Sequence, residues 1–245
     1  MRRRILTTYP QNYILVTYSI TSVGYSRIFG ESFDISQIKE LYLNNTKTSI
    51  GAEYYFSSTG TKTFKIVFEN DGLKNAINMF NNCTLLKTAD FSHAEGRYCT
   101  SMTGTFAGCT GVTTINLSGF CPLNCTSFIN TFNSCTSLTS LNFGNNFKCK
   151  PTDIRNMFHY CTKLPTIDMR TFDLSAVTQW GYTWARCLVM TKLYLNTSVN
   201  STFKSATNWM VENTASGTLY YNASKMSTSD MPTLPSSWRA VAYNY

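Results

Sequence analysis

The chain has 245 residues, of which 43% are aliphatic or aromatic and only 14% are charged, and its net charge is +8. This length and apolar content indicate a globular protein of one or two domains. The positive charge is spread thinly, with 8 basic and 5 acidic residues in 1–70 and 13 and 8 in 71–245, and only Arg2-Arg3-Arg4 forms a run. Because proteins that bind nucleic acids gather basic residues into a stripe with interleaved aromatic residues, we expect no nucleic-acid partner.

The N-terminal stretch is basic but lacks the pattern of a secretory signal. Pro10, Gln11 and Asn12 interrupt its apolar residues, and no small-x-small cleavage site follows. No run of about 18 apolar residues occurs in the chain, so we expect no membrane insertion. The nine cysteines are an odd number, which together with the missing signal favours a reduced, intracellular folding environment over a disulfide framework.

Residues 1–70 predict an all-β domain, a small sheet or sandwich of about five strands that ends near Asp71-Gly72. We expect this domain to pack on the repeats that follow, because an open solenoid end exposes apolar residues and unpaired strand edges. The β-rich segments are residues 12–20, 25–30, 38–43, 52–58 and 61–70.

A 26-residue repeat follows the β-rich region. Cysteines recur in one phase, and an aromatic residue precedes each of them by three positions. Continuing the period reaches Met210 and Asn213, which indicates a sixth, degraded copy. The aromatic and cysteine positions are Phe80/Cys83, Phe106/Cys109, Phe132/Cys135, Phe158/Cys161 and Trp184/Cys187.

Each repeat also carries two apolar residues two positions apart, which predicts a short strand. The apolar spacing i, i+1, i+4 of the Met-Phe-x-x-Cys segment predicts a short helix or 3₁₀ turn. A unit of this size cannot bury its apolar face alone, so about six units should stack as an α/β solenoid in residues 71–222. The strand pairs are Ala89/Phe91, Ile115/Leu117, Leu141/Phe143, Ile167/Met169, Leu193/Leu195 and Leu219/Tyr221.

The tail, residues 223–245, ends the series. Pro232 and Pro235 break regular structure, and the apolar positions in residues 238–243 predict one last strand over the final coil. We therefore expect a C-terminal cap.

The repeated phrase resembles a known family. Met-Phe-x-x-Cys-x-x-Leu-x-x-Leu-x-Leu, followed in residues 172–177 by Phe-Asp-x-Ser-x-Val, is similar to the BspA-type leucine-rich repeats, which are also catalogued as a domain of unknown function in mycoplasmas. The resemblance covers about residues 76–222. It implies a leucine-rich-repeat-like α/β solenoid and a surface-exposed binding protein of bacteria, some protists or bacteriophages, whose role is adhesion or is unknown.

The cysteine series predicts core packing rather than a metal site or a redox centre. Structural zinc needs four ligands that converge on one point, whereas cysteines in the same phase of separate coils form a line. Free cysteine packs well as a small apolar side chain. Cys99 and Cys125 are also 26 residues apart and predict a second, shorter line.

The sequence predicts neither an enzyme nor a cofactor. His93 and His159 are the only imidazoles, and His159 is expected to be a solvent-facing helical residue. The 13 carboxylates are scattered, and no phosphate-binding glycine motif occurs. A glycan hydrolase carried on a fibre is a less favoured alternative, which would need two carboxyl groups about 5–9.5 Å apart.

The outer face of the strand stack is the candidate binding surface. Residues between the inward-pointing pairs should point outward, forming a row that is polar at one end and aromatic at the other. Such side chains suit a protein or carbohydrate ligand, and a merely solvated sheet face is the alternative. The candidate residues are Asp90, Asn116, Asn142, Asp168, Arg170, Lys192, Tyr194 and Tyr220.

These patterns predict a non-catalytic recognition or structural protein. A surface-type repeat without a secretion signal fits a bacteriophage virion component, with a fibre, decoration or adhesion role, that is assembled in the host cytoplasm. Its partners would be a protein or carbohydrate ligand, further copies of the chain, or other virion proteins. The alternative is a bacterial cell-surface adhesin or a protein-interaction module.

Overall fold

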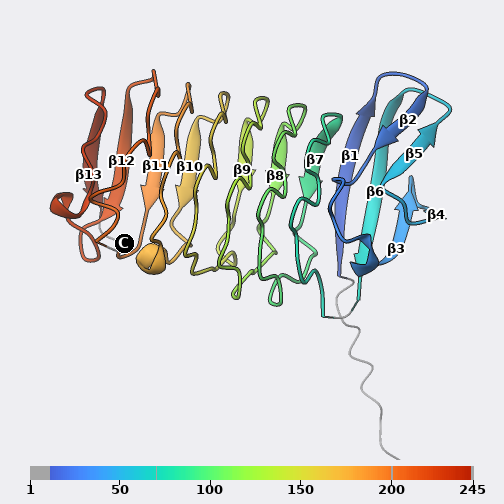
Figure 1. Cartoon of the computed structure of the whole chain (residues 1–245), viewed down its shortest axis with the longest axis horizontal. Helices are drawn as coiled ribbons and strands as arrows, with labels where there is room; N and C mark the ends of the chain where they lie inside the picture. The colour runs from blue at the N-terminus through green and yellow to red at the C-terminus, as the bar shows by residue number, and fades with distance from the viewer. Residues whose placement is uncertain (1–11, 70, 200, 244–245) are drawn as a thin grey trace, which may run out of the picture.

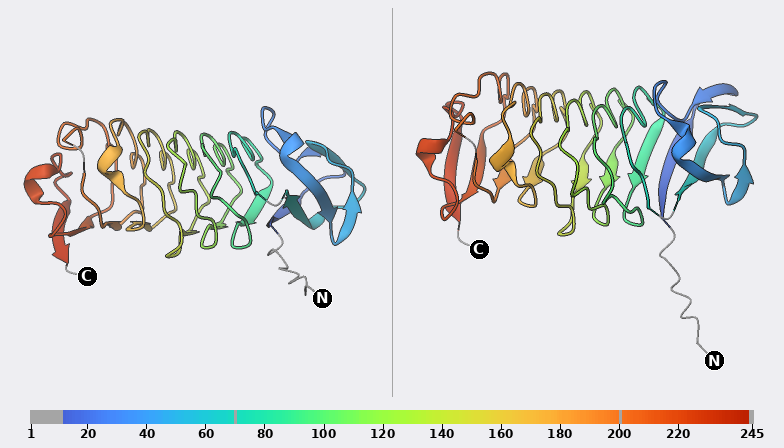
Figure 2. Two further views of the ribbon diagram at one scale, coloured as in Figure 1. Left: turned by 90° about the horizontal axis from the view of Figure 1, so that it is seen from below. Right: turned by 60° about the horizontal axis from the view of Figure 1, so that its bottom comes forward.

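The computed structural model describes residues 12–69, 71–199 and 201–243. The basic run at Arg2-Arg3-Arg4 and the interruption at residues 10–11 therefore lie outside the described residues. Narrow coils stack along the long axis, with a β-rich region at one end and the last strand at the other (Figure 1). Figure 2 shows the strands along one side of this stack and the remaining parts of each coil away from them.

Each coil contributes one short strand, and the predicted solenoid with its 26-residue step is confirmed. Neighbouring strands pair in parallel within two sheets, as in Ala89 with Ile115 and Leu193 with Leu219. The inward residues are buried, except that Leu141 and Tyr221 are half-buried. The strands are β7 (Leu86–Asp90), β8 (Thr114–Asn116), β9 (Ser140–Asn142), β10 (Thr166–Met169), β11 (Lys192–Leu195) and β12 (Gly217–Asn222).

The predicted α/β class is wrong, because the described residues contain no α-helix. Their helical content is three 3₁₀ turns, η1 (Ile35–Gln37), η2 (Leu174–Ala176) and η3 (Thr228–Asp230). The molecule is a predominantly β solenoid.

The Met-Phe-x-x-Cys segments are consecutive β-turns instead of helices. In the first, the N–H groups of Met79, Asn81 and Cys83 each donate to the carbonyl three residues earlier. The positions of Asn78 and Asn82 have left-handed backbone, with φ of 53° and 58°, which an α-helix of L-residues does not accommodate. We number coils 1 to 6 by these turns, at residues 76–83, 102–109, 128–135, 154–161, 180–187 and 206–213.

Turns form here instead of a helix because they allow the backbone of each coil to form hydrogen bonds with the next coil. Alternate N–H groups, those of Asn78, Phe80 and Asn82, donate to carbonyls of coil 2 at 2.7–2.9 Å. An isolated helix of this length would be marginal, whereas the turn gains hydrogen bonds to the neighbouring coil. His159 accordingly lies half-buried in a turn, not on a solvent-facing helix as predicted.

Phenylalanine rings form a column through the core. The rings in the column are those of Phe80, Phe106, Phe132 and Phe158. Centroids of successive rings lie 5.5, 5.7 and 5.3 Å apart, and the ring planes are within 21° of parallel. This separation is in the favourable range for offset stacking. The 26-residue period therefore puts equivalent rings in direct contact.

The cysteine series lies beside this column and is buried, as predicted. Each thiol from Cys109 to Cys187 donates to the carbonyl of the aromatic residue 29 positions earlier, at Sγ–O distances of 2.9–3.2 Å. Burial raises the pKa of Cys83 and of Cys187 to about 12. The cysteine is therefore a weak donor between coils and an unreactive thiol.

The sheet of the solenoid is interrupted between β9 and β10. In coils 2 and 3, the residue just before the strand is a threonine whose N–H donates to a carbonyl of the preceding coil. Thr113 donates in this way to the Lys87 carbonyl, and Thr139 to the Thr113 carbonyl. The next equivalent residue is Pro165, which has no N–H. The missing donor explains why strand pairing stops here and resumes from β10 onward.

The described part of the N-terminal region, residues 12–69, holds six strands rather than about five. The additional one is β4, which follows a tight turn at Asn44 and Asn45, both with positive φ. Strand β1 pairs antiparallel with β7, and Phe29 stacks on Phe80, so this region covers the open end of coil 1. The strands are β1 (Tyr13–Ile20), β2 (Gly24–Arg27), β3 (Ile38–Leu43), β4 (Thr46–Thr48), β5 (Glu53–Phe56) and β6 (Gly60–Phe68).

The last strand, β13 (Trp238–Tyr243), pairs in parallel with β12 and continues the stack. The Trp238 indole donates to the carbonyl of Ala215 at 3.0 Å, which holds the tail on coil 6. The strand lies where the apolar positions of the tail predicted it. The domain limits at residues 70 and 222 stay predictions from sequence pattern.

The burial of the thiols predicts selective labelling. Eight of the nine cysteines are buried, and only Cys121 is half-buried. In the native protein at pH 8 we expect one thiol to react quickly with a thiol reagent, and nine after unfolding in urea, because a buried thiol is not accessible to the reagent. Mass spectrometry of the labelled protein measures this. Cys121→Ser should abolish the native signal, and rapid labelling of several cysteines would contradict the assigned core.

Candidate functional site

The predicted outer row lies along the strands in two runs, one in β7–β9 and one in β10–β12, with no strand pairing between β9 and β10. Six of the eight candidates share one position of the strands, and within each run the pairing sets each of them beside its equivalent in the next coil. Arg170 directly follows β10, and Lys192 begins β11, where it is exposed. The six residues in line are Asp90, Asn116, Asn142, Asp168, Tyr194 and Tyr220.

The first half of the row is a ladder of side-chain hydrogen bonds. Asn116 donates its amide to Asp90 Oδ1 at 3.0 Å, and Asn142 donates to Asn116 Oδ1 at 3.1 Å. Each acceptor oxygen also binds a backbone N–H two residues later, as Asp90 does with Ser92 at 2.9 Å. These polar groups satisfy one another, so this half of the row serves the fold.

The ladder changes character at coil 4. Asp168 occupies the next position but has no amide donor to offer to Asn142. Its carboxylate instead holds the guanidinium of Arg170, with Nε to Oδ1 at 2.8 Å and Nε to Oδ2 at 3.0 Å. Both side chains keep over a third of their surface exposed. A half-exposed ion pair of this kind adds little to stability.

Two tyrosines follow the ion pair. Tyr194 and Tyr220 stack with centroids 4.6 Å apart and planes within 10°, and the Arg170 guanidinium carbon lies 5.2 Å from the Tyr194 centroid. Both rings are half-buried. Arginine over a tyrosine face is a favourable cation–π geometry. Arg170, Tyr194 and Tyr220 therefore present a rigid aromatic and cationic surface, which we call the strand-face cluster together with Asp168.

Tyr243 belongs to this neighbourhood, although sequence reasoning placed it only in the cap. Its hydroxyl donates to the carbonyl of Leu195 at 2.8 Å. Partial burial raises its pKa to about 12, against the opposing effect of the Arg170 charge. Its place could not be read from the repeat, because β13 lies outside the 26-residue period.

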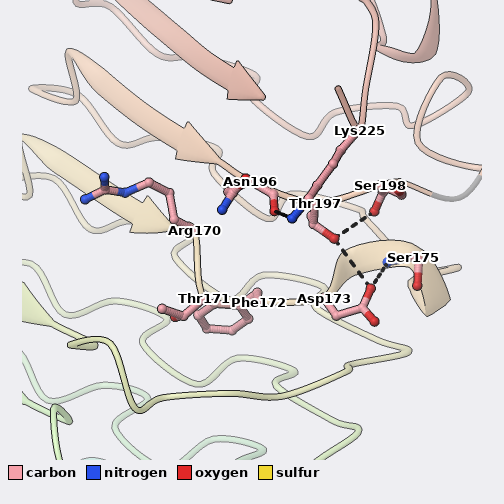
Figure 3. A pocket seen from close by; sticks show the side chains of 9 residues that line it. All are labelled: Arg170, Thr171, Phe172, Asp173, Ser175, Asn196, Thr197, Ser198 and Lys225. Atoms are coloured by element: carbon pink, nitrogen blue, oxygen red, sulfur yellow. Dashed lines mark hydrogen bonds between the residues drawn. The ribbon is translucent and has the colours of Figure 1, made fainter. Parts of the chain in front are cut away.

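A polar cleft of about 430 Å³ adjoins the cluster at the ends of β10 and β11 (Figure 3). Asp173 caps η2 by accepting the Ser175 N–H at 3.0 Å, and Thr197 reaches the same carboxylate oxygen at 3.4 Å. Partial burial opposes ionisation, but hydrogen bonds to Ser175 and the nearby Lys150 hold the pKa of Asp173 below its ordinary value. The cleft is lined by Arg170, Thr171, Phe172, Asp173, Ser175, Asn196, Thr197, Ser198 and Lys225.

The cleft was missed by sequence reasoning because three separate segments of the chain build it. Lys225 reaches back across one coil to donate to the carbonyl of Asn196 at 3.2 Å. The side chains of Lys225, Asp173 and Thr197 are thus bonded within the cleft, whereas the buried Thr171 Oγ1 has no hydrogen-bond partner. The cleft borders the strand-face cluster. The Asp-x-Ser of residues 173–175 was the available signal, since such a pair marks a capped turn.

A family model described as Mycoplasma protein of unknown function, DUF285, matches residues 74–197 and 100–231. The chain belongs to this family. Neither a curated protein nor a solved structure matches it. The DUF285 match spans the repeats and the start of the tail, so the family signal coincides with the solenoid and leaves out the N-terminal sheet.

Among the described residues, no three His, Cys, Asp or Glu side chains come together in a way that would hold a metal ion. In the same part of the chain, no helix has the length and apolar character needed to cross a membrane.

The ladder predicts that an Asn→Asp substitution lowers stability more at a ladder position than at an exposed position outside the ladder. Asn116→Asp removes the donor to Asp90 and sets two carboxylates side by side, so it should lower the free energy of unfolding by about 1–3 kcal/mol. Urea denaturation measures the change. The control Asn145→Asp makes the same change at an exposed position and should stay within about 0.5 kcal/mol. Equal changes in the free energy of unfolding for the two variants would contradict a structural role of the ladder.

Proposed function

We propose that this protein is a non-catalytic recognition protein whose strand-face cluster binds a protein or a glycan. The observation that carries the proposal is the change along a single row. Coils 1 to 3 fill it with Asp and Asn side chains that satisfy one another, whereas coils 5 and 6 fill it with Tyr194 and Tyr220. The tyrosines add no bond to the ladder and leave aromatic surface at the exterior.

The chemistry of the cluster fits a contact surface. Tyrosine and arginine are enriched at the energetic centres of interfaces, because each offers a large face together with polar groups. The stacked rings and the Asp168–Arg170 pair hold these groups in place before binding, which lowers the entropy lost on association. Lys192, exposed on the same sheet, adds positive charge at the rim.

The Asp168 carboxylate is engaged by Arg170 and the Asp173 carboxylate by Ser175, Thr197 and Lys150. This engagement supports a binding role over general acid or base chemistry. The resemblance of the repeat to BspA-type leucine-rich repeats supports a surface-exposed role. We place the protein in a bacteriophage particle, as a fibre, decoration or adhesion component. A bacterial surface adhesin or interaction module is the second candidate.

The binding role is tested by replacing the two tyrosines with Asn, the residue that occupies the equivalent positions of the ladder. The double variant Tyr194→Asn, Tyr220→Asn should fold, because Asn occupies this row in coils 2 and 3, with a small fall in the urea midpoint from the loss of the stacked rings. Its affinity should fall at least about tenfold. The measurement compares both proteins on the same spots of protein and glycan arrays. Ser140→Ala, on the same face of β9, serves as the control, and identical array profiles for the double variant would place binding elsewhere.

The particle role has a separate test. Mass spectrometry of purified phage particles from the source culture should detect the chain at a fixed ratio to the capsid protein. Detection only among proteins released from intact bacterial cells by surface proteolysis would favour the adhesin instead.

A further inference from the structure

The turn segments carry a second departure from the repeat, on residues that the strand face does not use. Two positions in each turn have left-handed backbone, with φ between 53° and 73° in all six coils. This conformation suits Gly and Asn and strains bulky residues. The first position holds Asn78, Gly104, Asn130, Asn156, Tyr182 and Asn208, and the second holds Asn82, Gly108, Ser134, Tyr160, Arg186 and Glu212.

Coils 1 to 3 carry Asn, Gly or Ser at both positions, whereas each of coils 4 to 6 carries at least one side chain that left-handed backbone disfavours. Tyr160, Tyr182, Arg186 and Glu212 all stand at left-handed positions where earlier coils have Asn, Gly or Ser. The fold itself does not require these side chains, because the same turn forms without them. Backbone strain that is retained in this way is concentrated at functional sites.

The unsuitable side chains are in contact with one another. The His159 ring lies 4.4 Å from Tyr160 and 5.6 Å from Tyr182, centroid to centroid. The Arg186 guanidinium carbon lies 4.8 Å from the Tyr160 centroid, and its Nη2 is 2.6 Å from a carboxylate oxygen of Glu212. We call these five residues the turn cluster; they connect coils 4, 5 and 6.

The turn cluster is exposed and has no net charge. Tyr182 is 42% exposed, and the side chains of Arg186 and Glu212 are 37% and 53% exposed. Arg186 and Glu212 neutralise each other. Burial, with help from the Arg186 charge, lowers the pKa of His159, so that imidazole is neutral at pH 7. The cluster therefore offers no electrostatic advantage to a nucleic acid or to an anionic surface.

The backbone beneath the cluster is closed to an added strand. The N–H groups of Asn156, Phe158 and Tyr160 donate to carbonyls of coil 5 at 2.9–3.2 Å, and Arg186 donates to Val211 at 3.0 Å. A peptide that binds by extending a sheet needs a free edge, and an anchored peptide needs an apolar groove. The cluster instead presents ring faces bordered by guanidinium, carboxylate and phenol groups.

We propose that the turn cluster is a second binding site, independent of the strand-face cluster, and that its ligand is an uncharged glycan. The C–H face of a sugar ring is apolar and packs on an aromatic ring, while its hydroxyl groups are both donors and acceptors. Tyr160, Tyr182 and His159 provide the faces. Arg186 donates and Glu212 accepts, so the border of the cluster matches both kinds of hydroxyl contact.

The test exploits the strain. The double variant Tyr160→Asn, Tyr182→Asn gives coils 4 and 5 the residue type found at these positions in coil 1. It should raise the urea midpoint, because Asn tolerates the left-handed backbone. It should also weaken binding to neutral glycans at least about tenfold on an array of neutral and sialylated or sulfated glycans. Asn156→Gly, a neighbouring left-handed position outside the cluster, is the matched control and should keep binding.

Each other outcome overturns the inference. A lower urea midpoint would make the tyrosines packing residues. Unchanged glycan binding, no binding of neutral glycans by the wild-type protein, or preference for acidic glycans would remove the proposed ligand. The Tyr194→Asn, Tyr220→Asn variant, tested on the same array, separates the two sites, because it should leave turn-cluster binding intact even where the strand-face proposal fails.

Discussion

Hydrogen bonds between the turns of adjacent coils are the constraint on which the solenoid depends. Alternate N–H groups of one turn donate to the next coil, as Phe80 does to Thr105 at 2.8 Å. This pattern fixes the offset between coils at one repeat. Once the offset is fixed, it alone brings equivalent side chains of adjacent coils into contact. The phenylalanine column, the thiol donors and the Asp/Asn ladder are three consequences of one backbone registry.

The same registry separates structural residues from candidate functional ones. A side chain that matches its equivalents, such as Asn116, forms hydrogen bonds with the equivalent residues of adjacent coils and thereby stabilises the fold. A side chain that departs from them, such as Tyr194 or Tyr160, gives up that partner and remains available. Departure from an internal repeat is therefore the basis of both proposals, because the equivalent positions of the other coils show which residue the fold alone accommodates.

Periodicity explains which parts of the fold could be predicted from the sequence. The 26-residue step, the strands and the buried cysteines follow from apolar spacing alone. The helix prediction was wrong because apolar residues at i, i+1 and i+4 also fit consecutive turns. The recurring Asn or Gly at positions 78, 104, 130 and 156 was the overlooked signal for left-handed backbone. The outer row was predictable, but its hydrogen-bonded half and the cleft depend on side-chain contacts that spacing does not encode.

The departures are not scattered along the stack. Both the strand-face cluster and the turn cluster begin in coil 4, and the sheet is interrupted just before β10, where Pro165 lacks the donor that other coils supply. Coils 1 to 3 continue the N-terminal sheet and keep to the repeat, whereas β10 to β13 form a sheet of their own. Turn hydrogen bonds still join coils 3 and 4, as from the Phe132 N–H to the Met157 carbonyl at 2.9 Å, but the strands of these coils do not pair. Coils 4 to 6 therefore carry both departures from the repeat, on two faces, beyond the end of the ladder that joins coils 1 to 3.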